Sequence, residues 1–241
     1  MMLAVSNIRK AFGGLTVLKG VDFEIEEGKI IGLIGPNGAG KTTLFNILSG
    51  ILRADSGTVL FRGSEIHRLA PFEICRRGIA RTYQIVRPFK KMTCLENVLV
   101  GTFSKRKMSK QSRVSKATAL LQLLGLQELR DHAAGEITLI QQKQLELARA
   151  LASEPSLILL DEILAGLNPK EVQLATAMIQ GIRKQFGVTI LWIEHLMGAI
   201  MGNTDRIVVL CNGKKISDGK PNTVATDKTV IEAYLGDSTY A

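Results

Sequence analysis

Aromatic residues and cysteines are scarce in this chain. Aromatic side chains make up 5% of its 241 residues, and three cysteines are present. Cys75, Cys94 and Cys211 are odd in number and far apart, which fits neither a disulfide framework nor a metal site, so we interpret them as reduced thiols. The hydrophobic share of 46% excludes a disordered chain, and the length allows one substantial core.

Long hydrophobic runs are also missing. The opening residues, MMLAVSNIRKAFGG, contain neither a long apolar stretch nor a small-residue cleavage site, so we expect no signal peptide. The most apolar candidate for a membrane span, VTILWIEHLMGAIMG at residues 188–202, is interrupted by Glu194 and His195. The sequence therefore predicts a chain that does not itself cross a membrane.

The positive charge of the chain is concentrated in one segment. The formal net charge is +9, and residues 87–116 hold nine lysines and arginines against one acid, Glu96. Because this segment has few aromatic residues, base stacking has little support, and we expect no nucleic acid partner. The segment is either a solvated helical face or a surface that meets an anionic membrane leaflet or an acidic partner loop. The nine residues are Arg87, Lys90, Lys91, Lys105, Arg106, Lys107, Lys110, Arg113 and Lys116.

Patterns near the start of the chain predict β-strands. Residues 21–26 alternate strictly between apolar and acidic side chains, which is typical of a half-buried strand. Residues 29–34 follow a turn as a largely continuous apolar run, as expected for a strand that is covered on both faces. Residues 56–63, SGTVLFRG, predict another strand between glycines.

Short β-rich runs alternate with helical patterns in the second half of the chain. The runs LILLDE, VTILWIEH and RIVVLCNG begin at residues 157, 188 and 206. This alternation indicates a largely parallel sheet. Residues 111–126 instead carry apolar side chains at helical spacing, with Gly125 as the stop. The region of about 87–150 lacks clear strands, so we interpret it as a helical lobe inserted into the fold.

A phosphate-binding motif follows the first buried strand. Residues 35–42 read GPNGAGKT and satisfy the pattern G-x-x-x-x-G-K-[ST] between a predicted strand and a predicted helix. The glycines let backbone N–H groups converge on phosphate oxygens, and the helix N-terminus adds a favourable dipole. We expect Lys41 to neutralise the β- and γ-phosphates, the Thr42 hydroxyl to ligate Mg²⁺, and Thr43 to extend the cradle. The expected nucleotide-binding residues here are Gly35, Pro36, Asn37, Gly38, Ala39, Gly40, Lys41, Thr42 and Thr43.

Two acids follow a later buried run. Leu157–Leu160 predict a strand that ends in Asp161 and Glu162. Because ligands of open α/β sheets bind beyond the carboxyl ends of the strands, both acids would point at the phosphates. We expect Asp161 to join the Mg²⁺ shell and Glu162 to orient and deprotonate the attacking water. Two adjacent acids alone would only cap a strand, but together with the phosphate loop they indicate catalysis.

With these motifs, the chain resembles the ATP-binding-cassette (ABC) ATPases over residues 3–236. The resemblance implies an α/β P-loop NTPase fold of the ABC-ATPase type, with a mainly parallel sheet core, an N-terminal antiparallel β region and an inserted helical subdomain. It implies a single domain over residues 1–241, with a core subdomain of about 1–86 and 155–241 and a helical subdomain of about 87–154. The implied activity is ATP hydrolysis, with ATP and Mg²⁺ bound.

Further residues match positions with known roles in that family. Phe12, 29 residues before Lys41, resembles the aromatic residue that stacks on adenine, and a core phenylalanine is the alternative interpretation. Gln84 resembles the glutamine that senses Mg²⁺ and the attacking water, so it is implied as both a catalytic and a metal-site residue. His195 resembles the switch histidine at the γ-phosphate. The stretch AGLNPKE at residues 165–171 resembles the loop that crosses to a partner ATPase.

A closer resemblance concerns the stretches RTYQIVRPFKKMTCLENVLVG, AGLNPKE and VIEAYLG, which look like the ATP-binding subunits of branched-chain amino-acid transporters. Urea and amide importers and the lipopolysaccharide-export ATPase share much of this pattern, so the transported solute stays open. The implied partners are integral membrane permease subunits, a second ATPase subunit (a heterodimer is favoured over a homodimer) and, indirectly, a solute-binding protein. The implied location is peripheral, at the cytoplasmic face of the cell membrane.

Several positions depart from the usual pattern of the family. Ile163 stands where proline commonly follows the catalytic acid, and Asn168 and Leu196 stand where aspartate is frequent. The largest departure is ITLIQ at residues 137–141, where Leu-Ser-Gly-Gly-Gln is usual.

The segment ITLIQ is interpreted as a loop that leads into a helix, because the following QQKQLELARAL carries apolar residues on one face. Thr138, Ile140 and Gln141 are the implied contacts to the ATP of a partner subunit. A glycine at position 140 would let the backbone approach a phosphate closely, whereas Ile140 adds a branched side chain there. The sequence therefore predicts a weakened phosphate reader.

Two other functional classes compete with a transport ATPase. Soluble cassette proteins of translation or DNA repair need two cassettes or a long coiled-coil insertion, and 241 residues offer neither. A small-molecule kinase would need an acceptor pocket, and it would leave Gln84 and His195 unexplained. An exporter of lipid or lipopolysaccharide remains the alternative within the transport class.

Overall fold

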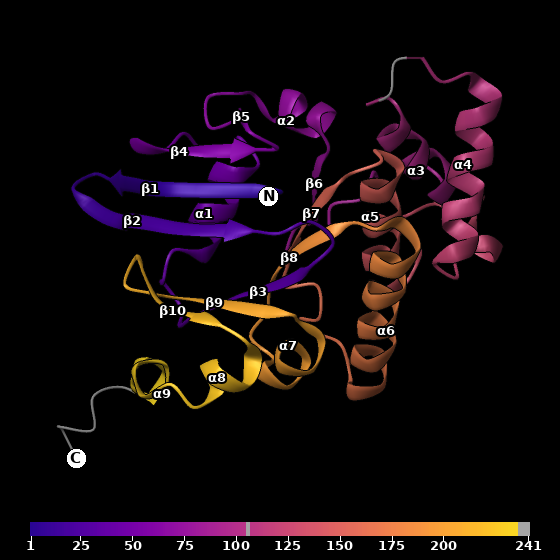
Figure 1. The fold of residues 1–241 in the computed structure, drawn as a ribbon. Coiled ribbons are helices and arrows are strands. Elements are labelled where there is room, and N and C mark those ends of the chain that lie inside the picture. The colour runs from indigo at the N-terminus through magenta and orange to yellow at the C-terminus, as the bar shows by residue number, and fades with distance from the viewer. Residues whose placement is uncertain (105–106, 236–241) are drawn as a thin grey trace.

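Two β-sheets form the centre of the molecule in the computed structural model, which describes residues 1–104 and 107–235 (Figure 1). One sheet has four strands in the order β2-β1-β4-β5, and its pairings are antiparallel. The other has six strands in the order β10-β9-β3-β8-β7-β6. The strands are β1 (Leu3–Phe12), β2 (Leu15–Ile25), β3 (Ile30–Ile34), β4 (Ser56–Phe61), β5 (Ser64–Glu65), β6 (Ile79–Arg81), β7 (Leu157–Asp161), β8 (Thr189–Ile193), β9 (Arg206–Cys211) and β10 (Lys214–Gly219).

The six-stranded sheet is parallel except for β10, which pairs antiparallel with β9. Its strands β3, β7 and β8 are buried along their whole length. Successive side chains of a strand point to opposite faces, and here the two faces belong to two separate cores. In β7, for example, Leu157 and Leu159 join one core while Ile158 and Leu160 join the other. This double burial is the reason for the continuous apolar runs in the sequence.

The antiparallel sheet covers one of these cores. In β2 the side chains of Val21, Phe23 and Ile25 are buried and those of Asp22 and Glu24 are exposed, as their alternation predicted. The same core takes residues from β1 and β4 and from the first helix, so it fills the space between the two sheets.

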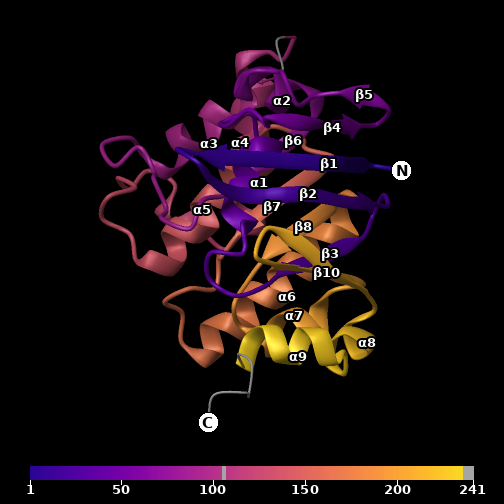
Figure 2. The same ribbon diagram turned by 90° about the vertical axis from the view of Figure 1, so that its left-hand side faces the viewer.

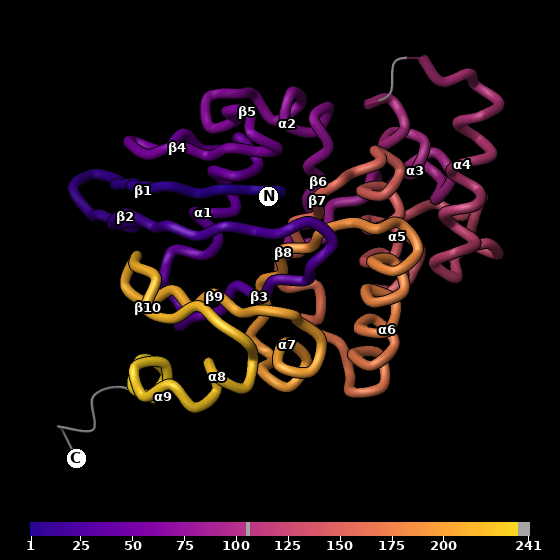
Figure 3. The backbone as a smooth tube through the Cα atoms, in the orientation of Figure 1, coloured from indigo at the N-terminus to yellow at the C-terminus, as the bar shows by residue number. Residues whose placement is uncertain are grey.

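Helices cover the opposite face of the six-stranded sheet. Figure 3 shows the chain leaving the sheet after β6, forming α3, α4 and α5 on one side of the molecule, and returning at β7. The α/β fold with an antiparallel β region and a helical insertion is thus confirmed, while the subdomain boundaries at about residues 86 and 154 stay a prediction. The helices are α1 (Lys41–Leu48), α2 (Pro71–Arg77), α3 (Cys94–Thr102), α4 (Lys110–Leu123), the 3₁₀ helix η1 (Gln127–Leu129), α5 (Leu139–Ala152), α6 (Pro169–Phe186), α7 (Met197–Asn203), α8 (Pro221–Ala225) and α9 (Lys228–Leu235).

The ends of the described chain lie in different parts of the fold. The N-terminus leads into β1 of the antiparallel sheet, and the last described element is α9. Figures 1 and 2 both show α9, together with α8, at the end of the molecule opposite α2. Within the ranges that the structure describes, no helix combines the length and the apolar character that a bilayer crossing needs.

The basic segment 87–116 is not a uniform surface. Lys105 and Arg106 lie outside the described residues. Arg113 is only 9% exposed, and its guanidinium donates hydrogen bonds to the backbone carbonyls of Met108 and Thr102. The nine lysines and arginines of the segment therefore do not all contribute to one surface, because Arg113 serves the packing of α4 against the end of α3.

Candidate functional site

The candidate site residues gather at one edge of the six-stranded sheet. Strands β3, β8, β7 and β6 are neighbours and run parallel, so their carboxyl ends share this edge. The loop of residues 35–43 follows β3, His195 follows β8, Asp161 and Glu162 stand at the end of β7, and Gln84 follows β6. The topology alone therefore brings together segments that lie far apart in the sequence.

Glycine is required at two positions of the phosphate loop. A Cβ on Gly35, whose φ is +146°, would lie 2.0 Å from the carbonyl oxygen of Leu210 at the end of β9. A Cβ on Gly40, whose φ is +101°, would lie 2.6 Å from a methyl group of Leu18. Gly40 is also the N-cap of α1, so the loop can turn into the helix with its backbone N–H groups free at the helix start.

Lys41, Thr42 and Thr43 are the loop's candidate contacts to phosphate and Mg²⁺. Lys41 is buried, and its Nζ donates to the carbonyl oxygens of Gly35 (2.6 Å) and Pro36 (3.0 Å), so the side chain spans the loop. Burial lowers the pKa of Lys41, while the nearby Glu162 and Asp161 raise it. Thr42 is exposed and Thr43 half-buried in the first turn of α1; around the loop, Asn37 and Gly38 are exposed, Pro36 is half-buried, and Ala39 is buried.

Glu162 has an unusual backbone conformation. Its φ is +49°, a region that residues other than glycine adopt rarely, and its N–H donates to the carbonyl oxygen of Ile193 at 2.9 Å. Strained conformations of this kind cluster at functional sites, where the surrounding structure holds them. The strain directs the Glu162 carboxylate across the strand ends rather than along its own strand.

Two of the expected site residues contact this carboxylate directly. The Nε2 of Gln84 donates to Oε2 of Glu162 at 2.6 Å, and the Nε2 of His195 lies 2.8 Å from Oε1. The three residues come from three neighbouring strand ends. Together they form the cluster Gln84–Glu162–His195, in which the carboxylate is held on both sides.

Asp161 is buried and paired with an arginine that the sequence analysis did not single out. The Nη2 of Arg81 donates to Oδ2 of Asp161 at 2.7 Å, and the two side chains are 6% and 4% exposed. Burial raises the pKa of Asp161, and the hydrogen bond from Arg81 opposes that rise. No local pattern in the sequence marks this pair, because Arg81 and Asp161 are 80 residues apart.

The donor set at this edge suits Mg²⁺ bound together with a nucleotide. No group of three His, Cys, Asp or Glu side chains that could hold a metal ion by itself occurs in the described chain. Mg²⁺ usually keeps several waters and is bound through one or two carboxylates plus the phosphates of its substrate. Thr42, Gln84 and Asp161 supply such oxygen donors beside the phosphate loop.

The loop of residues 162–168 is held from two sides by residues that the sequence analysis missed. The Nζ of Lys143, a buried residue of α5, donates to the carbonyl oxygens of Ile163 (2.7 Å) and Ala165 (2.6 Å). On the other side, Oε1 of the buried Glu194 accepts from the backbone N–H of Leu164 at 2.7 Å. Burial lowers the pKa of Lys143 and raises that of Glu194.

One departure from the family pattern, Asn168, has a local explanation. Asn168 caps α6: its side chain accepts from the N–H of Glu171, whose carboxylate accepts from the N–H of Asn168. Asparagine fills an N-cap as well as aspartate does. Ile163 offers its carbonyl to Lys143, and Leu196 precedes α7 as an exposed residue.

Phe12 is not a core residue. It ends β1 with 44% of its surface exposed, and the Nζ of Lys10 lies 5.3 Å from the centre of its ring. The alternative interpretation, a core phenylalanine, is therefore wrong. The exposed ring of Phe12 is available for stacking. The stacking on adenine stays a prediction.

The segment ITLIQ lies apart from the phosphate loop of its own chain. Thr138 is the N-cap of α5: its Oγ1 accepts from the N–H of Gln141 at 3.5 Å, and the Gln141 side chain accepts from the N–H of Thr138 at 2.9 Å. No hydrogen bond among the described residues joins Thr138, Ile140 or Gln141 to residues 35–43. The expected change from loop to helix is confirmed, and it occurs at Leu139.

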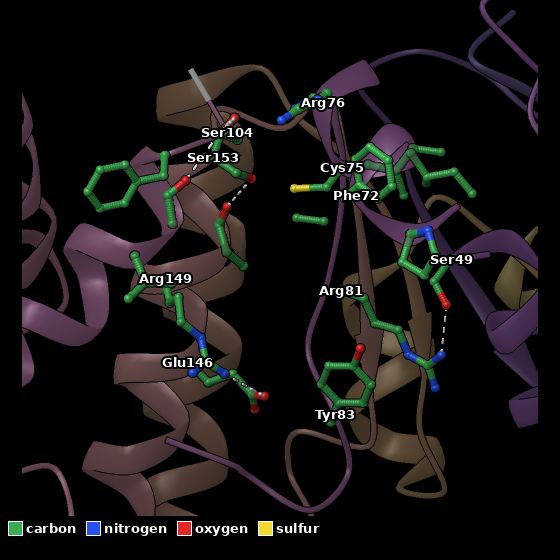
Figure 4. A pocket seen from close by; sticks show the side chains of 18 residues that line it. Ser49, Phe72, Cys75, Arg76, Arg81, Tyr83, Ser104, Glu146, Arg149 and Ser153 are labelled. Carbon is green, nitrogen blue, oxygen red and sulfur yellow. Dashed lines mark hydrogen bonds and ion pairs between the residues drawn. The ribbon is translucent and has the colours of Figure 1, made fainter. Parts of the chain in front are cut away.

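A groove separates the helices from the core on the side of β6. Figure 4 shows its two walls: Glu146, Arg149 and Ser153 come from the α5 side, and Phe72, Cys75, Arg76, Arg81 and Tyr83 from the α2 and β6 side. The groove has a volume of about 480 Å³. Phe72 and Phe103 line it with 59% and 65% of their surfaces exposed, so large apolar side chains face the solvent on both walls.

A buried carboxylate lines the same groove. Glu146 is 5% exposed, and its Oε1 has no hydrogen-bond partner within residues 1–104 and 107–235, with the guanidinium of Arg149 3.6 Å away. Burial raises the pKa of Glu146 to about 7, which Arg149, the backbone of Tyr83 and Lys143 oppose and Asp161 favours.

Comparison with known families and proteins identifies relatives over nearly the whole chain. A family model described as ABC transporter matches residues 18–165, and one described as Branched-chain amino acid ATP-binding cassette transporter matches residues 214–239. The high-affinity branched-chain amino acid transport ATP-binding protein BraF of Pseudomonas aeruginosa is 39% identical, over 98% of each chain. LivG of Escherichia coli is 37% identical over 98% of each chain, and a probable LivG of Archaeoglobus fulgidus is 39% identical over 98% of this chain and 95% of its own.

Solved structures agree with the sequence comparison. The ADP conformation of MJ1267, an ATP-binding cassette of an ABC transporter, superimposes with a TM-score of 0.88 at 35% identity, covering 98% of this chain and 99% of that one. The ATP-binding cassette MJ0796, described as a dimer in a post-hydrolysis state bound to ADP and Pi, superimposes with a TM-score of 0.82 at 26% identity, covering 91% of this chain and 99% of that one.

Proposed function

Because this chain belongs to the ABC transporter family of ATP-binding cassettes and is an ATP hydrolase of that family, we propose that it drives the import of branched-chain amino acids or related small polar solutes through separate permease subunits. The observation that supports the catalytic part best is the cluster Gln84–Glu162–His195 beside the phosphate loop. The names of the relatives support the solute class.

The phosphate loop and Lys41 bind the triphosphate. Lys41 already donates two hydrogen bonds across the loop, so an incoming phosphate replaces the carbonyl acceptors of Gly35 and Pro36 with stronger, charged ones. Backbone N–H groups at the start of α1 supply further donors, and the exposed ring of Phe12 stacks on adenine.

Thr42, Asp161 and Gln84 would hold Mg²⁺ beside the phosphate loop. The ion supplies charge neutralisation for the phosphate oxygens when it is bound. Asp161 offers a carboxylate held by Arg81, and Gln84 offers a side-chain amide that already reaches Glu162.

Glu162 acts on the attacking water as a general base. Each carboxylate oxygen has two lone pairs, so Glu162 can accept from Gln84 and His195 and still accept a proton from water. His195 is placed to contact the γ-phosphate, and its contact with Glu162 joins phosphate sensing to the base. Positioned proton transfer of this kind contributes about 10²–10⁴-fold to a rate.

The groove between α5 and the β6 side receives a cytoplasmic segment of the permease. Its exposed rings, Phe72 and Phe103, are the kind of apolar anchor points that stable interfaces bury. Arg81 lines the groove and also contacts Asp161. A permease segment in the groove would therefore be separated from the phosphate site by the side chain of Arg81.

A second ATPase subunit completes each phosphate site. Among the described residues, ITLIQ makes no hydrogen bond to its own phosphate loop, so Thr138, Ile140 and Gln141 serve the ATP of the partner. A heterodimer with a sister subunit is favoured over a homodimer. The assembly then lies peripherally at the cytoplasmic face of the cell membrane, and a solute-binding protein acts on the permeases rather than on this chain.

Solute uptake in the source organism tests this function. Deletion of the gene is expected to abolish ATP-dependent accumulation of labelled leucine, isoleucine and valine, and the wild-type gene, but not one carrying Glu162→Gln, restores it. If the deleted strain accumulates all three amino acids at the wild-type rate, the proposed solute class is wrong.

A further inference from the structure

Arg81 lies between the groove and the phosphate site. Its Nη2 donates to Oδ2 of Asp161 at 2.7 Å, and its Nη1 donates to Oδ1 of Asn46 at 2.7 Å and to Oγ of Ser49 at 3.0 Å. One guanidinium thus joins the end of β7 to the helix that follows the phosphate loop.

Aromatic rings fix the plane of this guanidinium. Its central carbon lies 5.6 Å from the ring centre of Phe45 and 4.9 Å from that of Tyr83. Phe45 is fully buried, and the side chain of Arg81 is 6% exposed. A planar group with fixed donors and two ring neighbours has little freedom to rotate.

The contacts of Asp161 leave one carboxylate oxygen for another ligand. Oδ2 accepts from Arg81, and the backbone N–H of Asp161 donates to Oγ1 of Thr82 at 3.3 Å. Oδ1 receives no hydrogen bond from the part of the chain that the structure describes.

We propose that Arg81 is a positioning residue for the magnesium site: by holding Oδ2 of Asp161 it presents Oδ1 to the cation. This inference rests on the proposed function, because it takes Asp161 as a residue of the Mg²⁺ shell. Residues that hydrogen-bond to metal-ligating groups orient them, and their loss lowers metal affinity by about 10–100-fold.

A second effect opposes the first. The positive charge of Arg81 repels a cation bound at Asp161, so its removal relieves that repulsion. However, removal also frees the carboxylate to turn away from the cation site, and loss of such an orienting partner lowers metal affinity by about 10–100-fold. The positioning effect therefore decides the sign, and metal affinity falls when Arg81 is replaced.

Binding of Mn²⁺, which stands in for Mg²⁺ and is visible by electron paramagnetic resonance, tests the inference without ATP turnover. Full-length Arg81→Met in the presence of ADP is expected to bind Mn²⁺ about 10–100-fold more weakly than wild type. Its affinity for a fluorescent ADP in EDTA stays within about twofold of wild type, because the phosphate loop is unchanged. Arg81→Lys recovers part of the Mn²⁺ affinity, since an ammonium can still pair with Oδ2 but not reach both Asn46 and Ser49.

Two further variants separate the possible causes. Arg206→Met removes another Arg–Asp pair (2.6 Å, to Asp218) at the amino end of β9, at the opposite edge of the sheet, and is expected to change neither affinity. Asp161→Asn is expected to weaken Mn²⁺ binding at least as much as Arg81→Met. If Asp161→Asn leaves Mn²⁺ affinity unchanged, the magnesium assignment of the proposed function fails and the inference with it.

Where Asp161→Asn does bind Mn²⁺ more weakly than wild type, either of two results overturns the inference alone. Unchanged or tighter Mn²⁺ binding in Arg81→Met shows that positioning is not its role. An equal loss of ADP affinity in EDTA shows that Arg81 only supports α1. If Arg81→Met unfolds at a temperature far below wild type, its weaker Mn²⁺ binding could come from a folding defect. Arg81→Lys then decides: it must bind Mn²⁺ more weakly than wild type while binding ADP normally.

Discussion

Glu162 shows at the scale of a single residue how the fold sustains a costly conformation. A residue other than glycine at φ +49° costs on the order of 1–3 kcal/mol, and the cost is tolerated only where neighbours hold the backbone. Hydrogen bonds supply that restraint. The N–H of Glu162 donates to Ile193, and the loop that follows is hydrogen-bonded by the side chains of Lys143 and Glu194. The sequence predicted Glu162 as the base but could not predict its backbone conformation, because φ depends on contacts from distant strands.

Glu146 makes the stability of the chain depend on pH. Its carboxyl loses a proton near the ordinary pKa of 4.5 in the unfolded chain and near 7 in the folded chain, because burial disfavours the charge. Between these values the folded state binds more protons than the unfolded state, so the free energy of unfolding falls as pH rises. Above pH 7 the full loss is about 3 kcal/mol.

Glu146→Gln is expected to remove this dependence. The variant should match wild type near pH 4.5 and become more stable by up to about 3 kcal/mol above pH 7. Urea unfolding of both proteins at several pH values between 5 and 8 gives the difference directly, and other titrating groups cancel. A difference that stays constant over this range would contradict the raised pKa of Glu146.

At the scale of elements, the sequence predicted the strands better than the contacts between segments. The buried runs and the β/α alternation gave β3, β7, β8 and β9, and the strand-end rule brought Gln84, Glu162 and His195 together. Arg81 and Lys143 were missed, because their partners lie 80 and 20 or more residues away and no local pattern marks such pairs. The strand order itself also follows from tertiary packing rather than from any local signal.

Lys143 connects α5 to the loop that follows Glu162. Lys143→Met is expected to lower the ATPase rate at least about tenfold, because the buried carbonyl of Ile163 loses its donor at about 1–3 kcal/mol. The carbonyl of Ala165 loses the same donor, so the loop is held less firmly. Affinity for ADP should stay within about twofold, since Lys41 and its loop are unchanged. Steady-state ATPase and ADP titration check this, with the exposed Lys184→Met as the matched control. Equal losses of rate and affinity would show a general folding defect instead.

We expect the segment ITLIQ, at the start of α5, to be a weakened phosphate reader. In the assembled transporter, Thr138→Ala is expected to reduce the ATPase rate less than tenfold, under about 1.4 kcal/mol, whereas Glu162→Gln is severe. Thr138→Ser keeps the helix cap and controls for the loss of about 1 kcal/mol that removal of an N-cap causes. If Thr138→Ala and Glu162→Gln lower the ATPase rate equally, ITLIQ reads the partner's phosphate as well as the usual Leu-Ser-Gly-Gly-Gln segment does.

At the scale of the whole molecule, one sheet separates two cores and carries the phosphate site on its edge. The core on one face packs against the antiparallel sheet, and the core on the other packs against the helices. The groove lies where the helical side meets β6, so a partner bound there contacts both sides at once (Figure 4). Such a position suits the transmission of movement between a permease and the ATP site.

Docking of the permease is expected to depend on Phe72. Phe72→Asp places a charge in the groove on a residue that is mostly exposed, so folding and ATP binding should be kept while co-purification with the permease subunits from membranes is lost. Phe186→Asp, on the far end of α6, is the control that should still co-purify. Permease recovery with Phe72→Asp equal to that of wild type would place the interface elsewhere.

The most direct measurement of the central claim is ATP binding and single-turnover hydrolysis by Glu162→Gln, with Lys41→Ala beside it. Glutamine can still accept from Gln84 and contact His195, so Glu162→Gln should bind ATP as wild type does and hydrolyse it roughly 10²–10⁴-fold more slowly. Lys41→Ala should lose ATP binding, because its charge has no substitute in the loop. Hydrolysis by Glu162→Gln at close to the wild-type rate would show that another group is the base, and unchanged ATP affinity of Lys41→Ala would remove the phosphate site from residues 35–43.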